Sequence, residues 1–342
     1  MNPHKIDVIG AGLPTPPEPS SVGLHFVSPP VPTRLYWICN SALWLCLLHN
    51  LILRDSFAPL AFVFYATPPI VVAIPAMSLA WWGRRWHDTL TSRASAVHRA
   101  TTALAILCLL DWGWSSFRSG SIPPHSPSDM TLTFWNTGRG EFANRDVITA
   151  ELQKTNADVI ALAEVTGREV QPQTFWKEHF PEYTAASLRD NLIVLVKDGD
   201  VEELNHGDLA GGGCYRLFAI NLRGDRFQIL LADLASNPFR SRQSPLNRLF
   251  EVLQKNQNIP TLVVGDFNTP PTSICFDKWR SHFTRAWDAA GTGYEPTWPQ
   301  PLPILAIDHI WGNQHITFRH YRAEWSRCSD HLRLVADFRV RL

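Results

Sequence analysis

The chain of 342 residues is long enough for one domain of about 200 residues and a second, smaller unit. Its 31 Lys and Arg balance 31 Asp and Glu, but the first 124 residues hold eight basic against five acidic side chains. The rest of the chain therefore carries a net charge of −3 with only five Lys, which excludes the broadly basic surface that duplex DNA binding needs.

Three apolar segments follow a Pro- and Ser-rich tail over residues 1–34, which we expect to be flexible and which lacks a signal-peptide pattern. The segments are Leu35–Leu53, Phe57–Trp82 and Ala100–Phe117. The second has 26 residues without a charge, enough to cross a bilayer even with several prolines kinking it. We expect about three transmembrane helices over residues 35–117; buried helices of a soluble protein are the alternative.

The charges between these segments predict the orientation. Residues 83–99 carry four Arg against one Asp, which marks this loop as cytoplasmic. Three crossings would place everything after Phe117 on the extracytoplasmic side, whereas two would leave it in the cytoplasm. The third segment, weakened by Asp111, therefore decides the compartment of an integral membrane protein.

A Pro- and Ser-rich linker over residues 118–129 leads to a soluble domain over residues 130–342. Short apolar runs alternate with charged stretches of helical spacing, which predicts an α+β fold in which two sheets pack as a sandwich with helices outside. The expected strands are Leu132–Trp135, Val159–Ala163, Asn191–Val196, Arg216–Asn221, Phe227–Ala232, Thr261–Val264, Ile304–Trp311 and Leu332–Val340, and the expected helices are Arg145–Thr155 and Pro245–Lys255.

Polar side chains stand where these apolar strands end. Asp266 and Asn268 follow one strand two residues apart, so their side chains point to the same side of an extended chain. This pair is suited to holding a water and a phosphate oxygen. Similar positions are occupied by Asn136, Glu164, Asp308, Asp330 and His331. Each alone is more often a turn, cap or ion-pair residue, but loops at one end of a sheet let such side chains converge.

Together these segments resemble the endonuclease/exonuclease/phosphatase superfamily, the metal-dependent phosphodiesterases and phosphatases that include DNase I. The matching pieces are Thr133–Asn136, Ala161–Glu164, Gly265–Asn268, Ile307–Ile310 and Ser329–His331, in the family's order. Gly-Asp-x-Asn and the final Ser-Asp-His are the specific ones. The resemblance implies a DNase I-like sandwich that hydrolyses a phosphodiester or phosphomonoester by in-line attack of water.

The resemblance also implies a role for each residue. Glu164, with Asn136 beside it, is expected to hold Mg²⁺ or Mn²⁺, since Mg²⁺ favours one or two carboxylates and retains several waters. Asp266 is expected to orient or deprotonate the attacking water, and Asn268 to contact the phosphate.

At the last motif, His331 is expected to donate a hydrogen bond to a phosphoryl oxygen. Asp308 would fix its tautomer and favour the charged imidazole, and Asp330 would hold a metal or the surroundings of His331.

One position departs from the family pattern. Many relatives have a His at the end of the strand before Gly-Asp-x-Asn, and this chain has Asp233. A carboxylate cannot stabilise a phosphate unless it is protonated or metal-bound. Either Arg240 or Arg242 takes over the phosphate, Asp233 binds a second metal, or the activity is reduced or altered. Asn191 lies near a weakly matching phosphate-binding position.

Fold alone does not name the substrate. Tethering near a bilayer favours a lipid or small phosphodiester, and an extracytoplasmic nuclease remains the alternative substrate class. A non-catalytic membrane protein that uses the same fold as a binding module is the competing class of function. The helices would contact membrane lipids, and the sequence indicates no obligate protein partner. Cys214, Cys275 and Cys328 are expected to be buried thiols, with one disulfide possible.

Overall fold

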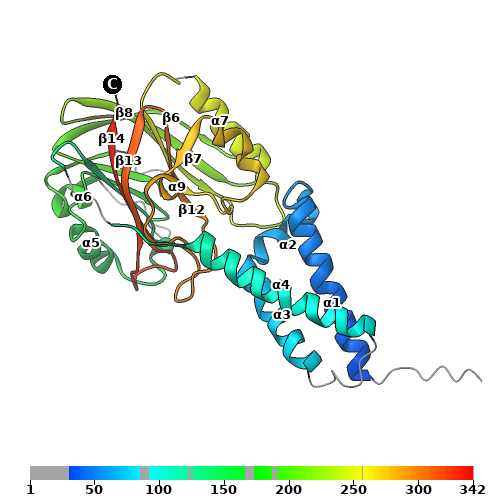
Figure 1. Cartoon of the computed structure of the whole chain (residues 1–342). Helices are drawn as coiled ribbons and strands as arrows, with labels where there is room; N and C mark the ends of the chain where they lie inside the picture. The colour runs from blue at the N-terminus through cyan, green and yellow to red at the C-terminus, as the bar shows by residue number, and fades with distance from the viewer. Residues whose placement is uncertain are drawn as a thin grey trace, which may run out of the picture.

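A bundle of helices projects from one end of a two-sheet sandwich in the computed structural model (Figure 1). The structure describes residues 31–84, 92–121, 124, 126–165, 173–186, 191–255 and 257–341. The predicted tail as far as residue 30 and residues 85–91 of the predicted cytoplasmic loop lie outside the described residues.

The bundle is made of three longer helices, with a short helix where it meets the sandwich. The longer ones are α1 (Val31–Leu48), α3 (Pro69–Arg84) and α4 (Ser92–Ser116); η1 (His49–Leu53) continues α1, and η2 (Ala58–Leu60) leads into the short α2 (Ala61–Ala66). Leu43, Val72 and Leu104 bring one side chain from each long helix into a shared apolar core. Thr101 donates a hydrogen bond of 2.7 Å to the side-chain oxygen of Asn40, which joins α4 to α1.

Two helices, Arg34–Leu53 and Ala94–Ser116, are long and apolar enough to cross a membrane. A third candidate is the pair Ala58–Ala66 and Pro69–Arg84, which is bent by 70°. The expected single segment over residues 57–82 is therefore two helices. Proline disfavours the helical region for the residue before it, and Thr67, before Pro68, has φ −125° and ψ 59°.

Each sheet of the sandwich has six strands, so the predicted α+β two-sheet architecture is confirmed. In spatial order the first sheet is β13 (Ile316–Glu324), β14 (Arg333–Val340), β2 (Met130–Asn136), β3 (Val159–Ala163), β5 (Ile193–Lys197) and β4 (Tyr183–Ala186). The second is β10 (Phe283–Arg285), β12 (Asp308–Asn313), β9 (Thr261–Asp266), β8 (Asp225–Leu234), β7 (Gly213–Leu222) and β6 (Gly199–Asp208). The short strand β1 (Phe117–Arg118) pairs with β11 (Gly293–Tyr294) and joins α4 to the domain.

The core lies between the two sheets. Phe134 and Val194 of the first sheet and Phe218, Ile229 and Val264 of the second are fully buried there. Helices α5 (Arg145–Gln153), α6 (Gln173–His179), α7 (Gln243–Gln254), α8 (Asp277–Arg280) and α9 (Ala286–Ala290) complete the domain. The central strands read as continuous apolar runs because both of their faces are covered.

One parallel strand pair lies near the middle of each sheet: β2 beside β3, and β8 beside β9. Every other neighbouring pair is antiparallel among the described strands. In a parallel pair both strands finish at the same edge of the sheet. The fold therefore presents the ends of β2, β3, β8 and β9 for use by a site.

Several elements differ from those expected. β4, β6 and β13 were not predicted, because their partly exposed faces give no apolar run; most side chains of β6 are exposed or half-buried. The strand expected over Ile304–Trp311 begins only at Asp308. All six cysteines are free, so the possible disulfide does not form in this structure.

Candidate functional site

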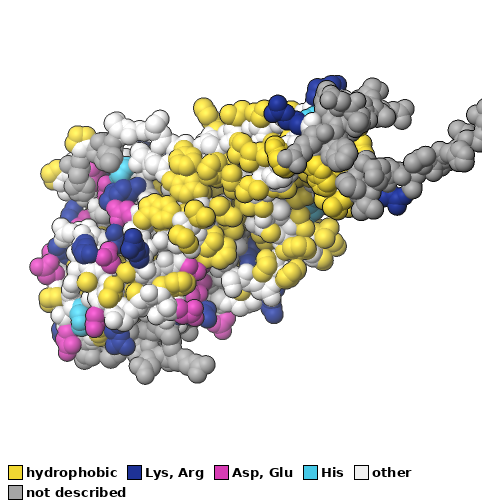
Figure 2. All heavy atoms as spheres, turned by 90° about the horizontal axis from the view of Figure 1, so that it is seen from below, with side chains coloured by type: hydrophobic (Ala, Val, Ile, Leu, Met, Phe, Trp, Pro, Cys, Tyr) yellow, Lys and Arg dark blue, Asp and Glu magenta, His cyan; other side chains and the backbone are white. Residues whose placement is uncertain are grey.

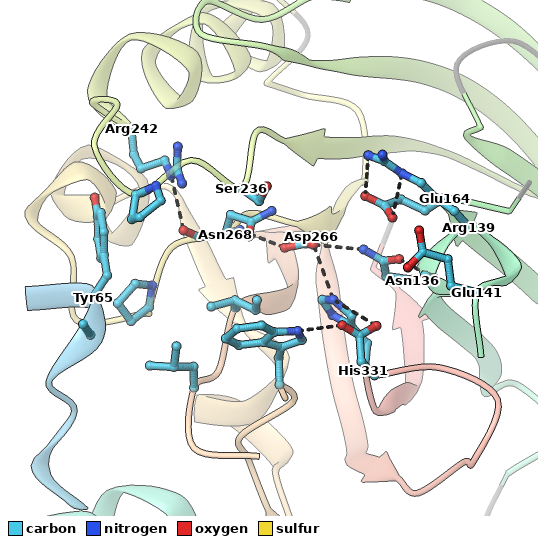
Figure 3. A pocket seen from close by; sticks show the side chains of 18 of the residues that line it. Tyr65, Asn136, Arg139, Glu141, Glu164, Ser236, Arg242, Asp266, Asn268 and His331 are labelled. Atoms are coloured by element: carbon cyan, nitrogen blue, oxygen red, sulfur yellow. Dashed lines mark hydrogen bonds and ion pairs between the residues drawn. The ribbon is translucent and has the colours of Figure 1, made fainter. Parts of the chain in front are cut away.

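The predicted polar residues meet at one edge of the sandwich (Figure 3). Asn136 and Asp266 are the last residues of β2 and β9, and Asp308 is the first residue of β12. Asp308 stands opposite Asp266 in the antiparallel register of these two strands. His331 lies just before β14 in the neighbouring sheet. Four segments that are far apart in the sequence therefore supply one cluster.

His331 and Asp308 form the centre of this cluster. Nδ1 of His331 lies 2.9 Å from a carboxylate oxygen of Asp308, and its Nε2 lies 3.9 Å from Asp266. Burial lowers the pKa of His331, but the facing carboxylates of Asp308, Asp266 and Asp330 outweigh this and raise it to about 10. The imidazole is therefore positively charged at neutral pH, with Nε2 turned toward Asp266.

Asp266 is held by two donors, one on each carboxylate oxygen. The backbone N–H of Asn268 and the side-chain amide of Asn136 each donate to it at 2.9 Å. Burial and the nearby Asp308 raise the pKa of Asp266 well above its usual range. A carboxylate so fixed and so basic is suited to orienting a water and accepting its proton.

Side-chain bonds between loops fix the positions of these groups. Ser329 donates to the backbone oxygen of Asn136 at 2.7 Å and accepts from the backbone N–H of His331 at 3.0 Å. The indole of Trp298 donates to Asp330 at 2.9 Å. Hydrogen bonds within the protein thus hold the Ser-Asp-His segment against the end of β2.

Asn268 and Arg242 form the next part of the wall. The side-chain amide of Asn268 donates to the backbone oxygen of Leu234 at 2.7 Å, and Nε of Arg242 donates to the backbone oxygen of Asn268 at 3.2 Å. Asn268 has a φ of 46°, in the left-handed region that Asn tolerates better than most residues.

Glu164 follows β3 with a φ of 52° and forms an ion pair of 3.2 Å with Arg139. Both side chains face the same cavity as Asn136. Glu164, which is predicted to bind the metal, is thus at the site, and its charge is neutralised by Arg139 in this structure.

Asp233 lies opposite Asp266 in the parallel register of β8 and β9. Burial and the carboxylate of Glu164 raise its pKa to about 7. Of the two arginines expected to replace the missing His, Arg242 lines the cavity and Arg240 does not. Asn191 also lies outside the cavity lining, so the structure does not bring these last two residues to the site.

The cavity has a volume of about 560 Å³. Its lining also includes residues that the sequence did not indicate: Phe62, Tyr65, Ala66, Arg139, Phe142, Pro238 and Trp298. The first three belong to α2, so the helical region forms part of the wall. No local sequence signal predicts this, because the contact depends on how two distant parts of the chain pack.

The carboxylates of this cluster, and not His331, suit a divalent cation. Ligand atoms of Asp266, Asp308 and His331 all lie within 4.8 Å of one another, and Oδ1 of Asp308 has no hydrogen-bond partner in the described part of the chain. A protonated His331 is not itself a ligand. The excess of carboxylates over cations nevertheless creates the field that attracts a metal ion.

Comparison with known proteins agrees with this geometry. A family model described as the endonuclease/exonuclease/phosphatase family matches residues 133–331. A search of curated proteins finds no match.

Solved structures share the fold. A family protein from Bacteroides thetaiotaomicron is 14% identical, with a TM-score of 0.52 over 62% of this chain and 98% of that chain. The human Nocturnin catalytic domain with a bound sulfate anion is 19% identical, with a TM-score of 0.50 over 62% and 94%. A mannosyl-6-phosphatase from the same Bacteroides is 15% identical, with a TM-score of 0.50 over 61% and 99%. At these identities the likeness shows the DNase I-like fold alone.

Proposed function

Because the chain belongs to the endonuclease/exonuclease/phosphatase family, we propose that it is a membrane-anchored, divalent-metal-dependent phosphoesterase. The observation that carries the proposal is the convergence of Asp266 and His331 beside Asn136 in one cavity, with the buried Asp308 bonded to His331. The reaction is hydrolysis of a phosphodiester or phosphomonoester by in-line attack of water.

Each group has a task in this reaction. Asp266, held by two donors, orients the attacking water and takes its proton. His331, charged through its bond to Asp308, donates from Nε2 to a phosphoryl oxygen that gains negative charge. Asn268 lines the cavity beside them, and its remaining amide hydrogen is available to the phosphate.

Glu164 and Asn136 would hold the metal ion, with Arg139 released from Glu164 when the ion binds. The ion would neutralise the phosphate and polarise its phosphorus–oxygen bond. We prefer this pair to the Asp266–Asp308–His331 group because His331 is protonated and bonded to Asp308.

The anchoring also belongs to the proposal. Residues near 54 and 117 contact the sandwich, because Arg54 donates to the backbone oxygen of Thr272 and Arg118 donates to that of Trp287. Figure 1 shows α1 running toward the sandwich, α3 away from it and α4 back again. This arrangement supports three crossings, with the sandwich on the side opposite the end of α3 and the start of α4.

The first prediction concerns catalysis. The purified full chain should hydrolyse bis-p-nitrophenyl phosphate with Mg²⁺ or Mn²⁺ and lose this activity in EDTA. Asp266→Asn and His331→Ala should each lower kcat by about 100-fold or more, because each removes a group that acts in the transition state. Release of p-nitrophenol is the measurement.

The matched control is Asp277→Asn, a change at an exposed carboxylate that pairs with Arg280. Full activity in Asp266→Asn, or none in the wild type with either metal, would refute the proposed reaction.

A further inference from the structure

The wall that α2 contributes to the catalytic cavity points to the kind of substrate. Phe62, Tyr65 and Ala66 line the same cavity as Asp266 and His331. They lie on its opposite wall from Glu164 and Arg139, and Figure 3 shows Tyr65 across the site from them. A helix of the membrane-associated region is therefore in position to touch whatever binds at the catalytic groups.

A buried polar network holds α2 in this place. The carboxylate of Asp55 accepts hydrogen bonds from the hydroxyl of Tyr65 at 3.0 Å, from Ser273, and from the backbone N–H of Ile274 at 3.1 Å. Arg242 adds a contact, since its guanidinium lies 5.8 Å from the ring centre of Tyr65. The segment after the Gly-Asp-Phe-Asn motif is thus bonded to the loop that precedes α2, and the wall is a fixed part of the site.

Beside this polar network, α2 and the sandwich also meet through aromatic side chains. The ring of Phe62 packs on that of Phe239, with centroids 5.0 Å apart. Phe239 is 62% exposed, and Phe62, which it contacts, lines the catalytic cavity. Phe142 and Leu305 add further apolar side chains to the lining of the cavity. Exposed aromatic rings beside a polar centre are suited to a ligand that is charged at one end and apolar at the other.

This apolar mouth faces the membrane-associated end of the molecule. The 70° bend between α2 and α3 turns α2 away from the direction of the candidate spans. Leu51, Phe57 and Leu60, which precede α2 in the chain, also have exposed side chains. In Figure 2 apolar side chains gather over the helical region, and charged side chains dominate the far end of the sandwich. The opening of the cavity would therefore lie at the surface of a bilayer that the helices span.

A nucleic acid fits this opening less well. Two arginines line the cavity: Arg242 donates to the backbone of Asn268, and Arg139, paired with Glu164, would be the one cation set free when the metal binds. Among the described residues the lining therefore offers no row of free cations to a polynucleotide backbone, which such binding requires.

From this geometry we propose that α2 and Phe239 form an alkyl-chain subsite of the catalytic cavity, which takes a phosphate-ester lipid directly from the bilayer. The phosphate occupies the Asp266–His331 end, and the chain leaves along Phe62 and Phe239 toward the membrane. The proposal rests on the proposed phosphoesterase function and adds the class of substrate.

The test compares two phosphodiesters with the same leaving group. Methyl p-nitrophenyl phosphate and dodecyl p-nitrophenyl phosphate are given to the full-length protein in dodecyl maltoside micelles, which contain no competing phosphate. Burial of four methylene groups alone strengthens binding about 200-fold. We therefore expect kcat/KM for the dodecyl ester, calculated from its free concentration in water, to exceed that for the methyl ester by at least about 100-fold.

Variants on α2 locate the effect. Phe62→Gln should reduce the dodecyl-to-methyl ratio of kcat/KM about tenfold, because it removes apolar contact from the chain. Phe239→Gln should lower the same ratio. Because Phe239 is exposed, its replacement should not disturb folding, and misfolding would not explain the lower ratio. Phe64→Gln is the matched control, since Phe64 lies on the same helix outside the cavity lining and should keep the wild-type ratio.

The outcomes separate the two proposals. If the wild type hydrolyses neither ester, the phosphoesterase function itself is overturned. Hydrolysis of both with a ratio near one, or a ratio lowered equally by Phe62→Gln and Phe64→Gln, would overturn the chain subsite and leave the reaction standing. Faster cleavage of a single-stranded oligodeoxynucleotide than of the dodecyl ester would also overturn it.

A second measurement needs no turnover. A dodecyl phosphate with a diazirine on its chain is photolysed with the Asp266→Asn protein, and the adducts are mapped by mass spectrometry. We expect labels within residues 58–66 and 236–242. Labels confined to α1 and α4 would show that the chain stays in the micelle and does not enter the cavity.

Discussion

His331 shows how a single charged residue depends on its neighbours. Alone in a buried position it would be neutral at pH 7, because burial disfavours the imidazolium. The hydrogen bond to Asp308 and the carboxylate of Asp266 reverse this and keep the charge. The catalytic use of His331 therefore depends on Asp308, which itself need not contact the substrate.

A second prediction follows at Asp308. Asp308→Asn keeps a hydrogen-bond acceptor for Nδ1 and removes the negative charge, so the pKa of His331 should fall from about 10 toward its ordinary value. Since the protonated form is the active one, the alkaline limit of kcat should move to lower pH by a few units. At pH 8 the rate should fall by up to about 30-fold, because only about 3% of His331 would be protonated at the ordinary pKa of about 6.5. A kcat profile between pH 5 and 10 checks this, and an unchanged alkaline limb would contradict it.

His309 gives the opposite case and a third prediction. Its ring is buried among aromatic side chains, and its Nε2 donates to the backbone oxygen of Thr269 at 2.8 Å. Burial, together with nearby Arg285, lowers the pKa of His309 to about 3. The unfolded chain binds a proton below about pH 6.5 and the folded chain does not, so stability falls by about 1.4 kcal/mol per pH unit below 6.5.

His309→Gln keeps a donor for Thr269 and cannot be protonated. Between pH 7 and pH 5 its Tm should therefore fall less than that of the wild type, a difference worth about 2 kcal/mol of unfolding free energy. Thermal unfolding in detergent at both pH values is the measurement. Parallel losses in the two proteins would show that His309 is not the source of acid sensitivity.

At the scale of elements, the contact between β8 and β9 positions the catalytic carboxylate. A Cβ on Gly265 would overlap the backbone oxygen of Ala232 in the neighbouring strand. Only glycine therefore lets the two strands pair up to Asp266. The glycine of the Gly-Asp-x-Asn motif has a packing role, while the two polar residues after it have the chemical ones.

The fourth prediction tests that role. Gly265→Ala should lower the free energy of unfolding by about 3 kcal/mol and reduce kcat, because the clash is with backbone that cannot move aside. Gly224→Ala is the control, since its Cβ would meet nothing within 4 Å and its positive φ should cost only about 1 kcal/mol. Chemical denaturation of both variants gives the comparison, and equal losses would contradict the packing role.

Several contacts join the helical bundle to the sandwich, and two of them fix its position. One is the network around Asp55, and the other is the pairing of β1 with β11 directly after α4. Both lie at the same end of the bundle (Figure 1). If α1, α3 and α4 each cross the membrane, the sandwich rests against one membrane surface and its orientation is fixed.

The fifth prediction concerns sidedness. A reporter fused after residue 342 should be active outside the cytoplasm, and one inserted at residue 88 should be active inside, because three crossings separate the two positions. Protease protection of closed vesicles provides a second measurement. A reporter after residue 342 that is active only in the cytoplasm would mean that α2 and α3 re-enter on one side and do not span.

The sequence by itself determined the α+β class, most central strands and the set of polar residues that end them. Buried strands such as β3 and β9 could be predicted because their sequences are unbroken apolar runs, and the Gly-Asp-x-Asn motif could be recognised because its residues are adjacent in the chain. Edge strands such as β6 could not be predicted, because their exposed faces carry polar residues like those of loops. The break at Thr67 was also missed, since proline can either kink a helix or end it.

Only the tertiary structure decided which candidates share the cavity. Arg242 does and Arg240 does not, although they are two residues apart, because one side chain turns inward toward Asn268. The same packing brought Tyr65 to the catalytic cavity from a helix that precedes the domain by more than sixty residues. Contacts between segments so distant in sequence depend on the relative placement of whole elements, and no local pattern of residues encodes that placement.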